Sequence, residues 1–317
     1  MPSTSSPAVS DELLVWLAES DPSIRWQVER DLLDLPKRQW SATRGLVGRE
    51  GWGAQTLDLQ DPEGTWGGGL YTPKWTSTNY TLLLLRRFGL DHENAKARAG
   101  CMHLLDDADW HEGGVSYWKT RELAERCVNG MVLSTCSYFR IDDPRVDSIA
   151  ELLLRVPMSD GGWNCEDYRG ATHSSFHTTI SVLEGLLEWK RATGSSAADS
   201  AIATGHEFML SHEMYKSHRT GDVINEAWLR PTFPPRWHYD VLRGLDHLQE
   251  VGADPDDRAA DATADLEARR RSDGRWPKGG QYTGVSHFTM EPGRVPGRWN
   301  TLRALRVLRW WRELTHS

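Results

Sequence analysis

The stretch SDGGWN at residues 159–164 sets a pattern that most of the chain repeats. An acidic residue, a glycine and a tryptophan follow one another in that order at three other places: DPEGTWGG (61–68), DWHEGGVSYW (109–118) and SDGRWP (272–277), with a weaker form, GREGWG, at 48–53. The four turns lie roughly 50 residues apart, except for a last gap of about twice that length, which predicts an internal repeat. The segment HRTGDVINEAW (218–228) is the expected degenerate copy in this gap.

Segments with helical patterns flank each turn. Those before the turns are amphipathic, as at 146–156, whereas those after them, as at 173–189, are richer in apolar residues and indicate more burial. No alternating strand pattern is present. A helix–turn–helix unit cannot bury both faces alone, so copies must stack, either as an open solenoid or as a closed ring. The contrast between the two helix sets favours an all-α, (α/α)6-type toroid with inner and outer helices.

Residues 11–45 lack the repeat and predict two capped helices. Ser10 and Asp21 are the expected N-caps, and Pro22 occupies the first position of the second helix. The expected division is a disordered N-terminus (1–10), a helical hairpin packed on the barrel (11–45) and a toroid catalytic domain (46–317).

Composition excludes several classes of protein. The formal charge is −8 and no long run of lysine and arginine occurs, so nucleic acid is not an expected partner. No apolar run is long enough to span a bilayer, although peripheral membrane contact stays open, and the N-terminus lacks the pattern of a secretory signal. The four cysteines form no CxxC pair and are expected to be reduced, which favours the cytoplasm.

The Gly–Trp turns between paired helices resemble the QW-type repeats of squalene–hopene cyclases. Over roughly residues 45–317, the layout is similar to the α/α-toroid superfamily of terpenoid cyclases and protein prenyltransferase β-subunits. The resemblance implies a cavity for an apolar, isoprenoid-like substrate, although one fold hosts several chemistries. Class II terpene cyclases carry an acidic DxDD or DxDTT motif at the head of an inner helix. Here His177, Thr178 and Thr179 stand in the corresponding place.

The prenyltransferase resemblance implies a zinc site. Those β-subunits bind zinc with an Asp-x-Cys pair at the head of one inner helix and a histidine at the head of the next. Glu125 and Cys127 match the first position, with Glu replacing Asp, and His177 matches the second. Cys165 is a further candidate, because thiolate and imidazole both suit zinc. The alternative is that Cys127 is simply a small buried residue and the histidines cap a helix.

Further candidates for acid–base chemistry surround His177. His173 lies four residues earlier, on the same face if both are helical, and Glu166 and Asp167 precede it in the loop. The clustered acids at 106–112 are expected to belong to the scaffold.

Two later segments also enter inner helices. Arg236, His238 and Asp240 follow two prolines and could bind an anion or transfer protons; the alternative is an ion pair between Arg236 and Asp240. Tyr282 and His287 belong to a long Gly/Pro-rich segment, 278–301, which is expected to lie over the barrel mouth.

Aromatic residues stand at or near the starts of the apolar helices, where π faces could stabilise a carbocation; ordinary packing accounts for some of them. They are Trp75, Tyr80, Trp118, Phe176, Trp237 and Trp299.

Three functions follow as hypotheses. The first is a terpenoid-cyclase-like enzyme that cyclises or isomerises an apolar substrate without the usual Asp-rich acid. The second is a zinc-dependent transferase or lyase, and the third is a non-catalytic repeat protein that binds a ligand or partner. No nucleotide cofactor is expected. The substrate and the oligomeric state are not encoded in any recognisable motif.

Overall fold

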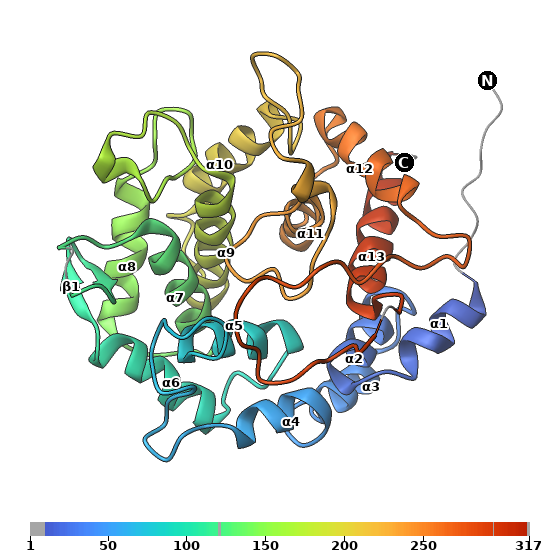
Figure 1. The fold of residues 1–317 in the computed structure, drawn as a ribbon, viewed down its shortest axis with the longest axis horizontal. Coiled ribbons are helices and arrows are strands. Elements are labelled where there is room, and N and C mark those ends of the chain that lie inside the picture. The colour runs from blue at the N-terminus through green and yellow to red at the C-terminus, as the bar shows by residue number, and fades with distance from the viewer. Residues whose placement is uncertain (1–9, 120–121, 294, 316–317) are drawn as a thin grey trace.

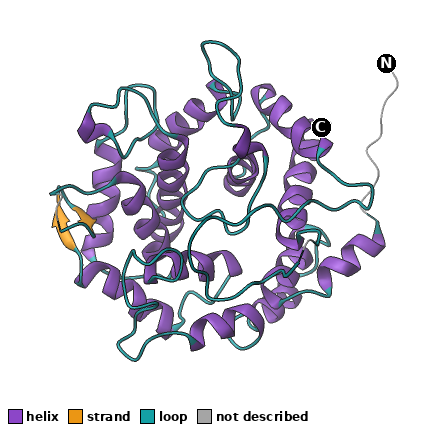
Figure 2. Ribbon diagram, viewed as in Figure 1, coloured by secondary structure: helices purple, strands orange, loops and turns teal. Residues whose placement is uncertain are grey.

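The computed structural model of the protein describes residues 10–119, 122–293 and 295–315 (Figure 1). The chain is mostly helical, with 53% of its residues in helices, as the sequence predicted (Figure 2). The helices of the described residues are α1 Asp11–Ala18, α2 Pro22–Asp31, α3 Lys37–Arg44, α4 Gly51–Asp58, α5 Thr78–Phe88, α6 Ala95–Asp106, α7 Arg126–Tyr138, α8 Pro144–Arg155, α9 Phe176–Thr193, α10 Asp199–Ser211, α11 Val241–Val251, α12 Ala260–Ala268 and α13 Arg298–Thr315.

Short elements complete the described structure. Three 3₁₀ helices are η1 Asp167–Arg169, η2 Glu226–Leu229 and η3 Asp257–Ala259. Strands β1 Asp109–His111 and β2 Gly114–Ser116 pair antiparallel within the second turn, a hairpin that the sequence pattern did not predict. No described helix combines the length and the apolar character that crossing a membrane requires.

Three of the Gly–Trp turns are built by one set of hydrogen bonds. The indole Nε1 of Trp66 donates to the carbonyl of Thr56 at 2.8 Å, ten residues earlier. Trp163 and Trp276 make the same bond at 2.8 Å, to the carbonyls of residues 153 and 266. In each turn the tryptophan N–H donates to a threonine hydroxyl of the next helix, at 3.0 Å. These three tryptophans are fully buried, so the bonds satisfy polar groups at the joint between successive helices.

The other two turns depart from this plan. In the second, Val115 takes the tryptophan's position, since its N–H and carbonyl both bond to the Asn129 side chain, at 2.8 and 2.9 Å. Trp118, which the sequence aligned with the repeat, lies three residues beyond. In the degenerate copy, Trp228 lies in η2 and its Nε1 has no hydrogen-bond partner among the described residues.

Alternate helices form a series around the centre of the molecule (Figure 1). In order, α5, α7, α9, α11 and α13 each contact the next, and α2 contacts both α13 and α5. Helices α6, α8, α10 and α12 lie outside this series. Each of α6, α8 and α12 contacts two successive members of it, and α10 contacts α9. The N-caps at Ser10 and Asp21 are confirmed, and α2 takes a place in this series. A third helix, α3, follows it before residue 45.

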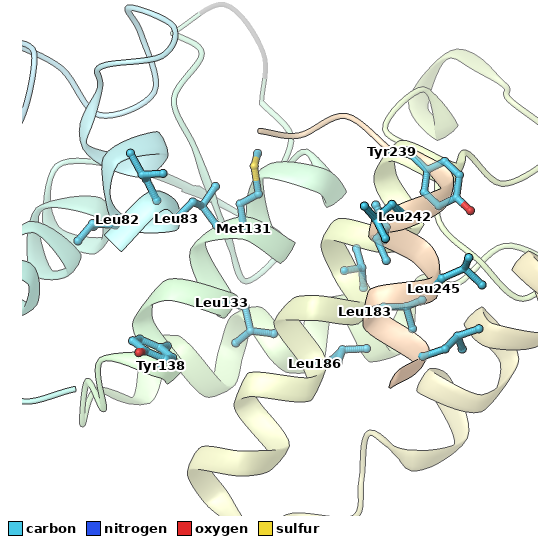
Figure 3. Close-up of a cluster of buried hydrophobic side chains, with 14 of the residues drawn as sticks. Leu82, Leu83, Met131, Leu133, Tyr138, Leu183, Leu186, Tyr239, Leu242 and Leu245 are labelled. Carbon is cyan, nitrogen blue, oxygen red and sulfur yellow. The ribbon is translucent and has the colours of Figure 1, made fainter. Parts of the chain in front are cut away.

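Apolar side chains and close backbone contacts hold these helices together. Leucines of α5, α7, α9 and α11 gather in one buried cluster (Figure 3). Helices α7 and α9 are in close contact at Gly130 and Gly185, where a Cβ on Gly185 would lie 2.5 Å from the carbonyl oxygen of Gly130. Only glycine permits this approach without moving a helix.

Candidate functional site

The predicted chemistry-bearing residues gather where the inner helices begin. Cys127 is in the first turn of α7, His177 is in the first turn of α9, and His238 lies three residues before the start of α11. We call the group formed by His177, His238, Trp237, Tyr282 and Trp75 the mouth cluster, because their rings contact one another in series.

His177 has a fixed orientation. Its Nδ1 accepts a hydrogen bond from the backbone N–H of Tyr239 at 2.8 Å, so the neutral ring carries its proton on Nε2. The ring lies edge-on to Trp237 and Trp228, at centroid distances of 5.1 and 5.7 Å. Burial, with a smaller contribution from Arg243, lowers the pKa of His177 to about 4. At neutral pH this imidazole is therefore an uncharged hydrogen-bond donor.

His238 is the second imidazole of the mouth cluster. Its ring is stacked between Trp237 and Tyr282, at centroid distances of 3.8 and 3.6 Å, and lies 5.9 Å from the ring of His177. Burial, followed by the neighbouring positive charges, lowers the pKa of His238 to about 4. Its Nδ1 is buried and bonds to no group of the described residues. A neutral imidazole with an unbonded ring nitrogen is suited to proton transfer.

The segment 278–293 crosses the centre of the molecule in the view of Figure 1, and it contacts the mouth cluster. The backbone N–H of Trp75 donates to Val285 at 2.7 Å, and the indole of Trp75 donates to the carbonyl of Tyr282 at 3.3 Å. His287 shares a hydrogen bond of 2.8 Å with the Thr81 hydroxyl of α5. A cavity of about 40 Å³ lies beneath this cover, which is room for about three water molecules.

Two cations lie against the aromatic rings. The Lys74 ammonium lies 5.5 to 5.6 Å from the ring centroids of Tyr71, Trp75 and Trp237. The Arg236 guanidinium lies 5.6 Å from the Trp75 centroid, and burial lowers the pKa of Arg236 to about 10. These distances are within the range of cation–π attraction, so the aromatic surfaces already bind positive charge.

Asp240 has a structural role instead of pairing with Arg236. Its carboxylate caps α11 by accepting the N–H groups of Arg243 and Thr232, at 2.7 and 3.3 Å. Burial raises the pKa of Asp240, which the two backbone donors partly offset. The Arg236 side chain instead donates to the Ser286 hydroxyl at 3.3 Å.

The remaining aromatic candidates divide between two places. Tyr80 packs edge-on against Trp75 at 4.9 Å, and Trp118 reaches the same region through Tyr71, at 6.0 Å. Phe176 packs against Tyr239 at 4.7 Å. Trp299 lies apart, stacked on Phe233 at 4.0 Å and on Phe88 at 5.9 Å.

Cys127 and Cys165 are brought together, and both are free thiols. The Cys165 sulfur accepts the backbone N–H of Cys127 at 3.1 Å and the Thr178 hydroxyl at 3.4 Å. The hydrogen bond from the Cys127 thiol is the largest of the effects that lower the pKa of Cys165. Cys165 is therefore the better nucleophile of the pair.

The predicted zinc ligands do not assemble into a complete set. No three histidine, cysteine or acidic side chains of the described residues form a group that could hold a metal ion. Cys127 and Cys165 are neighbours, but Nδ1 of His177 is taken by Tyr239. Glu125 is the residue before α7 and is not part of such a group either. The arrangement does not fit a zinc site, and the zinc prediction itself stays for metal analysis to decide.

Three predicted catalytic residues lie outside the mouth cluster. Glu166 is exposed and pairs with Arg169 at 2.8 Å, and Asp167 pairs with Arg126 at 3.0 Å. His173 is exposed on the loop before α9. Because α9 begins at Phe176, His173 lies before the helix, and the condition under which His173 and His177 would share a helix face is not met.

Ion pairs occupy the space between the inner helices, below the mouth cluster. Glu184 of α9 accepts from Arg87 of α5 at 2.9 Å and from Arg243 of α11 at 2.8 Å, and its side chain is 5% exposed. Arg303 of α13 pairs with Asp246 of α11 at 3.1 Å. The prediction of an apolar interior was wrong, because buried charged side chains form ion pairs between the inner helices.

Sequence reasoning missed Lys74, although a signal for it exists. Lys74–Trp75, Arg236–Trp237 and Arg298–Trp299 are basic–tryptophan pairs just before or at the start of an inner helix. In each pair, the basic residue lies over the ring of a nearby tryptophan, so the pair of a basic residue and a tryptophan is the signal for these cations.

Comparisons with known proteins give no family. No protein-family model matches the chain, and no curated protein matches it significantly. A crystal structure of a protein from Actinoplanes is similar over 92% of this chain and 90% of that chain, with 18% sequence identity and a TM-score of 0.48.

Proposed function

We propose that the fold is the (α/α)6-type toroid of the terpenoid cyclase and prenyltransferase superfamily, with α2 as its sixth inner helix. The order of contacts around α2, α5, α7, α9, α11 and α13 supports this assignment. The repeated tryptophan bonds support it as well, because one joint is used three times between an outer and an inner helix.

Within that fold, we propose a small-molecule enzyme that works at the mouth cluster. The observation that carries the proposal is the pair of neutral imidazoles, His177 and His238, between aromatic walls. A cyclisation that begins with protonation needs a strong acid, whereas these histidines are uncharged at neutral pH. Proton transfer that isomerises an apolar, isoprenoid-type substrate is therefore favoured over acid-started cyclisation.

The roles of the two histidines differ in this proposal. The Nε2–H of His177 would donate a hydrogen bond to an oxygen of the substrate and polarise the adjacent carbons. His238 would take a proton from one carbon and return it to another carbon of the same conjugated unit. One C–H bond breaks and another forms, so no oxidant or reductant is required.

Substrate entry requires the segment 278–293 to move. The cavity of about 40 Å³ is too small for an isoprenoid, and Tyr282 lies directly on the ring of His238. Moving that segment would expose the rings of Trp75 and Trp237, at which Lys74 now lies.

Incubation in D2O with linear isoprenoid aldehydes, alcohols and diphosphates, and with squalene, tests the proposal. Mass spectrometry should detect solvent deuterium in a recovered substrate or an isomer. His238→Ala should abolish the exchange, whereas His173→Ala, an exposed histidine outside the mouth cluster, should not. If the wild type neither incorporates deuterium into any of these compounds nor converts any of them to an isomer, isomerisation of these isoprenoids is excluded. A cyclised product without dependence on His238 would favour the cyclase hypothesis instead.

A further inference from the structure

A second pocket, of about 600 Å³, lies where the inner helices end. Its lining includes Gly89, which follows α5, Tyr138 at the end of α7, Arg191 near the end of α9 and Glu250 near the end of α11. The mouth cluster lies at the opposite ends of these helices, and Phe233 lines both this pocket and the cavity beneath the segment 278–293. We call this second site the arginine pocket.

The lining of the arginine pocket is strongly basic. Eight arginines and four carboxylates contribute to it, which is an excess of four positive charges. The chain as a whole has a formal charge of −8, so this excess runs against the overall composition. Such a concentration of one sign in a concave site raises the local concentration of ions of the opposite sign.

Each carboxylate of the pocket already pairs with an arginine of the lining. Asp246 accepts from Nε of Arg303 at 3.1 Å and from Nε of Arg306 at 2.5 Å. The other three carboxylates pair with arginines of the same lining in a similar way. Guanidinium donors therefore remain after every carboxylate has a partner.

Arg303 provides the clearest case of unused donors. Its side chain is 2% exposed, and only its Nε is hydrogen-bonded. Both terminal nitrogens, Nη1 and Nη2, are buried and have no hydrogen-bond partner among the described residues. A buried charged donor without an acceptor costs free energy, and an anion that reached it would remove that cost.

We infer that the arginine pocket binds a small phosphorylated molecule. Planar guanidinium groups bind phosphate oxygens in pairs, and a doubly or triply charged group matches the excess positive charge better than a single carboxylate. A pocket of this volume has room for an organic portion beyond the phosphate. Trp26, Phe233 and Trp299 supply apolar wall for that portion.

Isothermal titration of the full chain with inorganic diphosphate and with inorganic phosphate tests this inference. Diphosphate should bind, and more tightly than phosphate, because it offers more oxygens and more charge. Arg303→Met should weaken diphosphate binding about tenfold or more, since the loss of one charge-assisted pair is worth that much. Asp246 keeps Arg306 as a partner in this variant, so the interior retains one ion pair there.

A second variant and a control make the result decisive. Arg140→Gln changes an exposed residue of the lining that bonds only to backbone carbonyls, and it should also weaken binding. Arg312→Met lies on the same helix as Arg303 but outside the pocket, and it should not. The inference would be overturned if all three variants bound diphosphate with equal affinity. It would also be overturned if chloride at matched ionic strength gave the same binding signal as diphosphate. Tighter binding of citrate than of diphosphate would overturn the assignment to phosphate.

Discussion

Nδ1 of His177 lies 2.8 Å from the backbone nitrogen of Tyr239, and this one bond determines what the histidine can do. It joins the first turn of α9 to the segment that enters α11, and it leaves Nε2 as the protonated nitrogen. The same bond orients the ring away from metal coordination through Nδ1.

We expect His177 to remain uncharged and protonated on Nε2 from neutral pH down to about pH 4, because burial disfavours its charged form. Nitrogen NMR of labelled histidine, recorded across that range, measures both the tautomer and the pKa. His177→Ala, which lacks these signals, assigns them to His177. A His177 pKa near 6.5, or a proton on Nδ1, would contradict the assigned role.

The hydrogen bond from the tryptophan indole to a backbone carbonyl in each of the three turns should contribute measurably to the free energy of unfolding. Trp163→Phe leaves the carbonyl of Leu153 without its donor and should lower the free energy of unfolding by about 1–3 kcal/mol. Trp228→Phe is the matched control, because Trp228 is buried but its Nε1 has no bond to lose. Urea unfolding of both variants decides the point, and equal losses would show that ring packing alone is responsible.

Glu184→Gln should destabilise the protein more strongly. The substitution leaves Arg87 and Arg243 buried without the carboxylate with which both pair, which costs about 3–5 kcal/mol. Glu151→Gln, on the exposed face of α8, is the control and should be nearly neutral. Chemical denaturation would contradict the expectation if the two variants were equally stable.

Acid should weaken the fold through His206 and His247. Their Nε2 atoms lie 3.0 Å apart, and burial lowers the pKa of His206 to about 3 and of His247 to about 4. Between pH 4 and about 6.5 the unfolded chain binds more protons, so the free energy of unfolding falls as pH falls, by up to about 1.4 kcal/mol per pH unit for each histidine. Urea unfolding at several pH values should give a smaller slope for a His206→Gln, His247→Gln double variant. An unchanged slope would assign the acid sensitivity to other groups.

Metal analysis of protein purified without added zinc decides the zinc hypothesis. The geometry leads us to expect less than stoichiometric zinc, because His177 does not join Cys127 and Cys165. Stoichiometric zinc that is lost in Cys127→Ala would contradict this expectation. Retention of zinc in that variant would place the metal elsewhere.

The sequence predicted the turns correctly where the same residue type makes the same hydrogen bonds in each repeat. Trp66, Trp163 and Trp276 were identified as a repeat, and their hydrogen bonds are the same in all three turns. The second turn was misaligned on Trp118 because a strand hairpin moves the equivalent backbone bonds to Val115, which carries no recognisable signature.

The interior charges could not be predicted from local patterns. Arg87 and Glu184 are 97 residues apart, so neither segment alone distinguishes a buried ion pair from a solvated charge. The orientation of a side chain also cannot be predicted from a local sequence pattern. The loop and helix positions indicated that Cys127, Cys165 and His177 are near one another, but the bond from His177 to Tyr239 depends on the backbone of a third segment.

The contact between α2 and α13 has a consequence for synthesis. Ile24, Trp26 and Val28 of α2 leave the ribosome long before α13 is synthesised, yet α13 is one of the helices beside which α2 packs. Contacts of such high sequence separation form slowly, and this one cannot form until α13 exists. Nascent chains that stall before α13 would therefore expose α2, and chaperones that bind apolar helices would have a target there.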